Sequence, residues 1–138
     1  MELKDFIENI LGIHVNNISY YDTAFTHKSY INEQENNILD SYERLEFLGD
    51  AIIDHVVSHW LYIKYAKSNE GTLTKKRAAL VNRDFLAMLG KKIDIINVIN
   101  IDSGVNLNDK KVSDNISADI YESIVGAIYL DGGYENAE

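Results

Sequence analysis

Apolar residues recur every three to four positions along most of this chain, which is the spacing of one face of an α-helix. In the first segment, Leu3, Phe6, Ile7 and Ile10 share one face, and Gly12 follows where such a helix would end. The same pattern predicts helices over residues 3–11, 20–27, 41–65, 74–81, 84–89 and about 113–132. Because helical periodicity dominates, we predict an all-α fold.

Glycine and polar residues divide this pattern. Glu70–Gly71 predicts a break before a helix pair, Asn82–Arg83 the junction within that pair, Gly90 its end and Gly132–Gly133 the end of the last helix. Residues 32–37 and 106–111 are polar and predict loops. Residues 93–101 are rich in β-branched side chains but lie between helices with no partner strand, so we interpret them as helix and irregular chain.

The longest predicted helix, residues 41–65, has two faces of different character. Its apolar face is predicted to pack in the core and contains Leu45, Leu48, Ile52, Val56, Trp60 and Ile63. At about 100° per residue, four acids fall within about 80° of arc on the other side: Glu43, Glu46, Asp50 and Asp54. Farther along, this acidic strip is continued by Ile53, Val57 and Leu61, so we expect other parts of the protein to cover that side. The acids would then line a crevice.

Helix energetics alone do not favour this arrangement. Like charges three or four positions apart cost about 0.2–0.5 kcal/mol per pair, and Gly49 in the same helix costs about 1 kcal/mol relative to alanine. We interpret the two penalties as a sign that something outside the helix compensates them. A divalent cation held by oxygen ligands is the first candidate.

The last predicted helix supplies a second acidic pair. Asp119 and Glu122 are three positions apart and therefore share one face, with Gly126 one turn farther along. A residue as small as glycine would let two helices approach closely and bring four carboxylates around one centre. Oxygen ligands without histidine or cysteine suit Mg²⁺ or Mn²⁺, and such a metal supports phosphoryl-transfer chemistry.

Composition predicts one globular domain of 138 residues, 46% apolar and 25% charged. Cysteine is absent, which excludes disulfides, a zinc–thiolate site and a thiol nucleophile. We find neither a secretory signal nor an apolar run of the roughly 18 residues that span a membrane. The expected location is therefore cytoplasmic, with no membrane partner.

The net charge of −9 is unevenly distributed. Eight of the 13 Lys and Arg residues lie between Lys64 and Lys92, and the rest of the chain is strongly acidic. This basic segment, which includes Lys75, Lys76 and Arg77, is compatible with a surface that faces nucleic-acid phosphates. Solvated helix faces would give the same pattern.

Four ordered motifs carry a resemblance to a known family. They are Phe25–Tyr30, Glu43–Asp50, Glu70–Val81 and the closing segments Ala118–Glu122 and Gly126–Gly133. Together they resemble the ribonuclease III family of double-stranded RNA endonucleases, although Lys28 stands where that family often has arginine. The resemblance covers nearly the whole chain and implies that residues 1–138 form the helical nuclease domain of that family.

The resemblance also implies roles for individual residues. The catalytic metal site, for Mg²⁺ with Mn²⁺ as a substitute, would be formed by Glu46, Asp50, Asp119 and Glu122. Glu43 and Glu70 would line the active-site valley, and Phe47 would pack into the other subunit of a homodimer. Asp54 matches no functional position of the family.

The implied activity is metal-dependent hydrolysis of double-stranded RNA in RNA processing, leaving 5′-phosphate and 3′-hydroxyl ends with short 3′ overhangs. Recognition of A-form RNA relies mainly on shape and backbone contacts, so we expect little base specificity. Lys75, Lys76 and Arg77 are the candidate RNA-binding residues. Bacterial members carry a double-stranded-RNA-binding domain after the nuclease domain, and this chain stops at Glu138, before one would begin.

Two other classes of protein compete with this interpretation. A ribosome-associated or RNA-processing subunit could use the same fold without cutting, but the intact set of four acids argues against it. A di-metal redox bundle would be expected to carry Glu-x-x-His motifs, and the sequence contains none.

Overall fold

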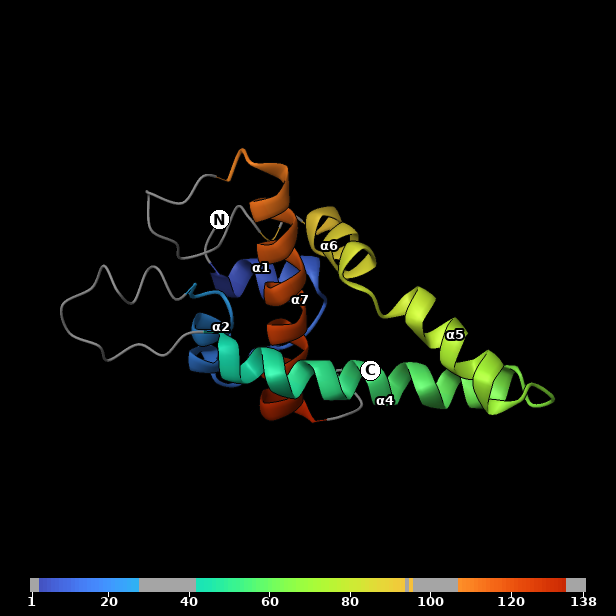
Figure 1. Ribbon diagram of the computed structural model, residues 1–138. Coiled ribbons are helices and arrows are strands. Elements are labelled where there is room, and N and C mark those ends of the chain that lie inside the picture. The colour runs from blue at the N-terminus through green and yellow to red at the C-terminus, as the bar shows by residue number, and fades with distance from the viewer. Residues whose placement is uncertain (1–2, 28–41, 94, 96–106, 134–138) are drawn as a thin grey trace.

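The computed structural model describes residues 3–27, 42–93, 95 and 107–133. The helices are α1 (Leu3–Ile10), α2 (Ile18–Ala24), α4 (Glu43–Lys64), α5 (Glu70–Leu80), α6 (Arg83–Lys92) and α7 (Lys110–Gly132). All of these elements are α-helices, which confirms the all-α prediction for the described ranges (Figure 1). Three parts of the predictions lie outside the described residues: residues 28–30 of the motif Phe25–Tyr30, the predicted loop at 32–37, and residues 93–101 apart from 93 and 95.

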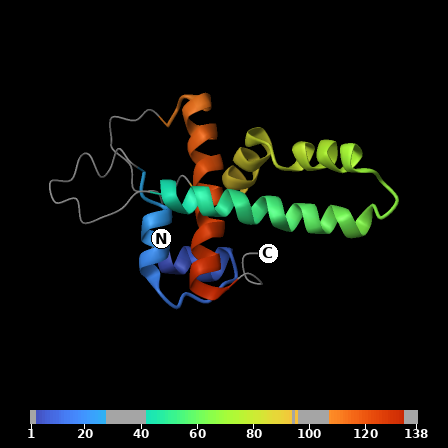
Figure 2. The ribbon, with the colours of Figure 1, turned by 60° about the horizontal axis from the view of Figure 1, so that its bottom comes forward.

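Helices α4 and α7 cross at the centre of the fold (Figures 1 and 2). Two glycines, Gly49 on α4 and Gly126 on α7, lie at the crossing point. A Cβ added to Gly126 would lie 2.5 Å from the carbonyl oxygen of Leu45, and one added to Gly49 would overlap the carbonyl oxygen of Glu122. The prediction that Gly126 permits a close approach is therefore confirmed. The cost of Gly49 within α4 is explained by this contact between backbones, without any need for a cation.

The hydrophobic core lies where α1, α2 and the first half of α4 surround α7. Its largest fully buried apolar side chains include Phe6, Tyr21, Phe25 and Ile120. Asp131, at the end of α7, fastens the segment before α2 to this core: it accepts hydrogen bonds from the backbone of Asn16 and Asn17 and from the hydroxyl of Tyr21. Helix α7 thus forms the centre of the domain.

Helix α6 packs against α7 through Leu86, Ala87 and Gly90, all of which are buried. A Cβ on Gly90 would lie 2.6 Å from the carbonyl oxygen of Ser117. The prediction that Gly90 ends this helix is therefore wrong, because the glycine permits close packing in the helix interior and α6 continues to Lys92.

The second half of α4 extends beyond α7, and α5 returns alongside it (Figures 1 and 2). Leu61 is buried there, but Trp60 is 49% and Ile63 65% exposed, so the prediction that these two residues belong to the core is wrong. No residue of α5 is buried. Helical spacing identified an apolar face correctly, but the neighbouring helices cover only its first part.

Side-chain caps set the first residue of two helices, and both helices begin earlier than the sequence analysis predicted. The Asn69 side chain accepts a hydrogen bond from the Thr72 backbone at 2.9 Å, so α5 begins at Glu70, where a break was expected. Asp109 caps α7 in the same way through the backbone of Lys111, and α7 begins three positions before Ser113. Asn82 caps α6, as its place at the predicted junction suggests.

Candidate metal centre

The crossing of α4 and α7 brings the predicted acids together. Carboxylate oxygens of Glu46, Asp119 and Glu122 all lie within 4.8 Å of one another. Asp50 lines the same open pocket as Glu46 and Glu122, and its charge acts directly on Glu122. Three of the four acids expected at the metal site therefore converge, and the fourth, Asp50, lies beside Glu122.

The local sequence explains why the side chains converge. Gly49 directly precedes Asp50 and touches the α7 backbone at Glu122, and Gly126 lies one turn after Glu122. Because neither glycine has a side chain to separate the helices, the acids next to them face one another across a short gap. The same two residues thus determine both the helix crossing and the geometry of the acids.

Burial and mutual repulsion make this cluster electrostatically unfavourable. Glu122 is only 7% exposed. Burial, followed by the negative charge of Asp119, raises the pKa of Glu46 to about 7, while burial and the charge of Asp50 raise the pKa of Glu122 to about 8. A divalent cation would relieve this repulsion, and the all-oxygen donor set fits Mg²⁺ or Mn²⁺.

Two further side chains hold Asp119, and sequence reasoning missed both. Arg83 Nη1 lies 2.7 Å from Asp119 Oδ1, and the Tyr42 hydroxyl donates to Asp119 Oδ2 at 3.2 Å. The Tyr42 backbone is in turn held by the buried Ser123 hydroxyl, which donates to its carbonyl at 3.1 Å. Arg83 was visible only as one member of the basic segment. Tyr42 lies one turn before Glu46 in the predicted helix at 41–65, but that spacing gives no sign of its contact with Asp119.

The other residues expected at the site are placed differently. Glu43 and Phe47 line the carboxylate pocket, and Phe47 is 82% exposed. Glu70, in contrast, lines a separate groove between α4 and α5 together with Ser58 and Leu73, so it does not join the cluster within one protomer. Its role in the valley stays a prediction.

The three candidate RNA-binding residues lie on α5, where two of them have intramolecular contacts. Arg77 donates to the Ser58 hydroxyl at 2.9 Å, and the Lys76 ammonium lies 4.1 Å from the centre of the Tyr65 ring. Lys75 is exposed. An RNA contact is therefore a simpler expectation for Lys75 than for its two neighbours.

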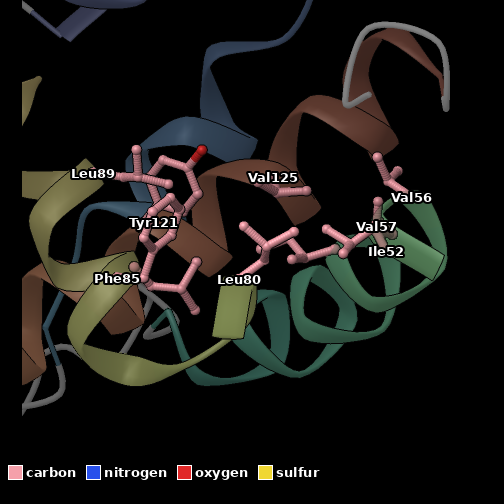
Figure 3. A pocket seen from close by; sticks show the side chains of 10 residues that line it. Ile52, Val56, Val57, Leu80, Phe85, Leu89, Tyr121 and Val125 are labelled. Carbon is pink, nitrogen blue, oxygen red and sulfur yellow. The ribbon is translucent and has the colours of Figure 1, made fainter. Parts of the chain in front are cut away.

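Helices α4, α6 and α7, together with Leu80 at the end of α5, line an apolar pocket of about 210 Å³ (Figure 3). Its wall contains Ile53 and Val57, the residues that continue the acidic strip along α4, and Phe85 and Tyr121 from the facing helices. The prediction that other segments cover this side of α4 is confirmed.

Comparisons with known proteins identify the family to which this fold and this acidic cluster belong. Residues 17–138 match the family model described as Ribonuclease-III-like, and the chain belongs to the ribonuclease III family. Ribonuclease 3 of Leptospira interrogans is 40% identical over 128 residues, which cover 93% of this chain and 51% of that protein. Ribonuclease 3 of Limosilactobacillus fermentum is 36% identical over 137 residues, or 99% of this chain and 59% of that protein.

Solved structures give the same assignment for the fold. The nuclease domain of ribonuclease III from Campylobacter jejuni superposes with a TM-score of 0.85 at 36% identity, covering 99% of this chain and 89% of that one. A second structure of that domain is described in terms of structural flexibility in a region involved in dimer formation. The chain spans about half the length of the curated relatives it matches. Among the described helices, none is long and apolar enough to cross a membrane.

Proposed function

We propose that this chain is the nuclease domain of a metal-dependent endoribonuclease that hydrolyses double-stranded RNA. The observation that carries the proposal is the convergence of Glu46, Asp119 and Glu122, with Asp50 beside them, in a chain of the ribonuclease III family. The products would be RNA duplexes with 5′-phosphate and 3′-hydroxyl ends and short 3′ overhangs. We place the enzyme in the cytoplasm, where it would process RNA.

In this proposal the four acids hold Mg²⁺, with Mn²⁺ as a substitute. Once bound, the metal supplies activation of water and neutralisation of the charge that develops at phosphorus. Tyr42 and Arg83 keep Asp119 in place, and the buried Ser123 keeps Tyr42 in place.

We further propose that the protein acts as a homodimer. Phe47 is 82% exposed beside the acids, a position in which a large aromatic side chain favours a partner surface. Two copies would present two carboxylate clusters, one to each RNA strand, which accounts for a staggered cut. Lys75 and its neighbours on α5 would contact the RNA backbone through its phosphates.

Digestion of a long, perfect RNA duplex with and without Mg²⁺ tests the activity directly. Wild-type protein should cut only with the metal, and phosphatase treatment should remove one phosphate from each new 5′ end. Glu122→Gln should lower the rate by several decades, because losing a metal ligand is worth several kcal/mol at the transition state. Its melting temperature without metal should be equal to or slightly above that of wild type, and the stabilisation by Mg²⁺ should shrink.

Asp54→Asn is the matched control for this experiment. Asp54 is an acid on the same helix, but the carboxylate pocket does not include it. The control should cut within about threefold of wild type, a barrier change of less than about 1 kcal/mol. A Glu122→Gln protein that retained a rate within about tenfold of wild type would rule out Glu122 as a catalytic metal ligand.

A further inference from the structure

Arg83 is the single cation among the described residues that line the carboxylate pocket; the others are Glu43, Glu46, Phe47, Asp50 and Glu122. It is the first residue of α6, and the preceding Asn82 caps that helix, so the backbone at this position is well fixed. A guanidinium is thus held at the rim of a pocket whose remaining charged groups are all acids.

Among the residues that the structure describes, every hydrogen bond of the Arg83 side chain is donated by the same nitrogen. Nη1 lies 2.7 Å from Asp119 Oδ1 and 3.3 Å from the backbone oxygen of Asn115. A guanidinium has five N–H donors in a planar fork, and within the described part of the chain no hydrogen bond uses those on Nη2 or Nε. The side chain is also 49% exposed. The anchored guanidinium therefore retains donors for an acceptor from outside the protein.

A simpler interpretation is that Arg83 only fastens α6 to α7. Docking of α6 already rests on the buried Leu86 and Ala87 and on the close approach at Gly90. Lys91 and Asp114 form another ion pair between the same two helices. Because a partly exposed ion pair contributes only about 0–1 kcal/mol, a purely structural role leaves the location of Arg83 beside the acids unexplained.

We propose that Arg83 binds a non-bridging phosphate oxygen of the RNA backbone at the carboxylate pocket. This inference rests on the proposed function and deepens it by naming a residue that contacts substrate. A phosphodiester that approaches the acids is repelled by their charge, and a metal ion offsets only part of it. A guanidinium fork matches phosphate oxygens well, and Asp119 and Asn115 hold it where the phosphate must enter.

The test compares Arg83→Met, Arg83→Lys and the control Lys91→Met, which removes the other ion pair between α6 and α7. Each change is made in the Glu122→Gln background, and binding of a duplex RNA with Mg²⁺ is measured by fluorescence anisotropy across a salt series. Arg83→Met should weaken binding about tenfold and reduce the salt slope by about 1, the loss of one phosphate contact. Arg83→Lys should keep the slope and recover part of the affinity, and Lys91→Met should change neither.

A second measurement separates this role from that of holding Asp119. Mg²⁺ binding to the RNA-free protein, without the Glu122 change, is followed by calorimetry. Arg83→Met should bind Mg²⁺ at least as tightly as wild type, since it removes a positive charge near the metal. Weaker Mg²⁺ binding that parallels the loss of RNA affinity, or an RNA affinity equal to that of Lys91→Met, would overturn the proposal. Failure of the wild-type protein to cut RNA would instead defeat the proposed function, and the binding measurements would still report on Arg83.

Discussion

Replacing Gly126 with alanine tests whether the helix crossing determines both stability and the metal site. The added Cβ would lie 2.5 Å from the Leu45 carbonyl oxygen and 3.3 Å from the Gly49 backbone nitrogen. An ordinary carbon–oxygen contact is about 3.3 Å or longer, so α4 and α7 must separate locally by about 0.8 Å. Both contacts are with backbone, and no rotation of a side chain can relieve them.

The magnitude follows from three contributions. Alanine is favoured over glycine within a helix by about 1 kcal/mol. Overpacking of a tight contact typically costs about 1–3 kcal/mol, and a gap of about 0.5–1 Å also removes a quarter to a half of the dispersion attraction of the atoms beside it. The residues on either side of Gly126 in this part of α7, Ile124 and Ala127, are buried. We expect Gly126→Ala to lower the free energy of unfolding by about 1–2 kcal/mol.

Urea unfolding in EDTA, followed by far-UV circular dichroism, measures this change. Gly71→Ala is the control, because Gly71 is an exposed helical glycine whose added Cβ would meet only the Asn69 side chain, at an ordinary 3.6 Å. That variant should gain about 0.5–1 kcal/mol. Gly126→Ala should also lose part of its stabilisation by Mg²⁺, since Glu122 moves with α7. Equal stabilisation of the two variants would refute the reasoning.

Three further predictions concern protons, the dimer and RNA. Because the folded-state pKa values of Glu46 and Glu122 are raised, to about 7 and about 8, their contribution to the stability of the metal-free protein is present below about pH 4 and is lost as pH rises through about 7–8. Mg²⁺ affinity should accordingly increase from about pH 6 to pH 9 in calorimetric titrations, and a flat profile would contradict the raised pKa values. Phe47→Ala should shift the protein toward monomer in sedimentation experiments, since truncating a buried interface aromatic can cost about 2 kcal/mol; a wild-type monomer at micromolar concentration would defeat the dimer. Lys75→Gln should reduce the salt slope of RNA binding more than Lys76→Gln, because the Lys76 ammonium packs on Tyr65. If both variants kept the wild-type salt slope, both lysines would belong to the solvated surface.

Local patterns predicted the acids because helical geometry depends only on nearby residues. The spacing of Glu46 and Asp50, and of Asp119 and Glu122, determines which face each carboxylate occupies, and Gly126 marked where two faces could meet. The crossing confirms that reasoning. It also corrects the interpretation of Gly49, whose energetic cost is offset by helix packing.

What the sequence did not predict depends on contacts between distant segments. Trp60 and Ile63 have the right spacing for the core, but no helix of the described fold covers them fully, and α4 continues past the helix that buries its first half. Gly90 looks like a helix end until Ser117 is placed against it. Arg83 reaches an acid 36 positions away, a distance at which no periodicity applies.

The concentration of buried residues in α7 has a consequence for how the site responds to fluctuations. Ten residues of α7 are buried, Glu122 among them, whereas α5 has none. Amide hydrogens of buried helices exchange with solvent mainly through global unfolding, and those of exposed helices through local opening. Hydrogen exchange should therefore be slowest along α7 and fast along α5. Helix α5 can thus open locally many times while Asp119 and Glu122, on the buried helix, keep their positions.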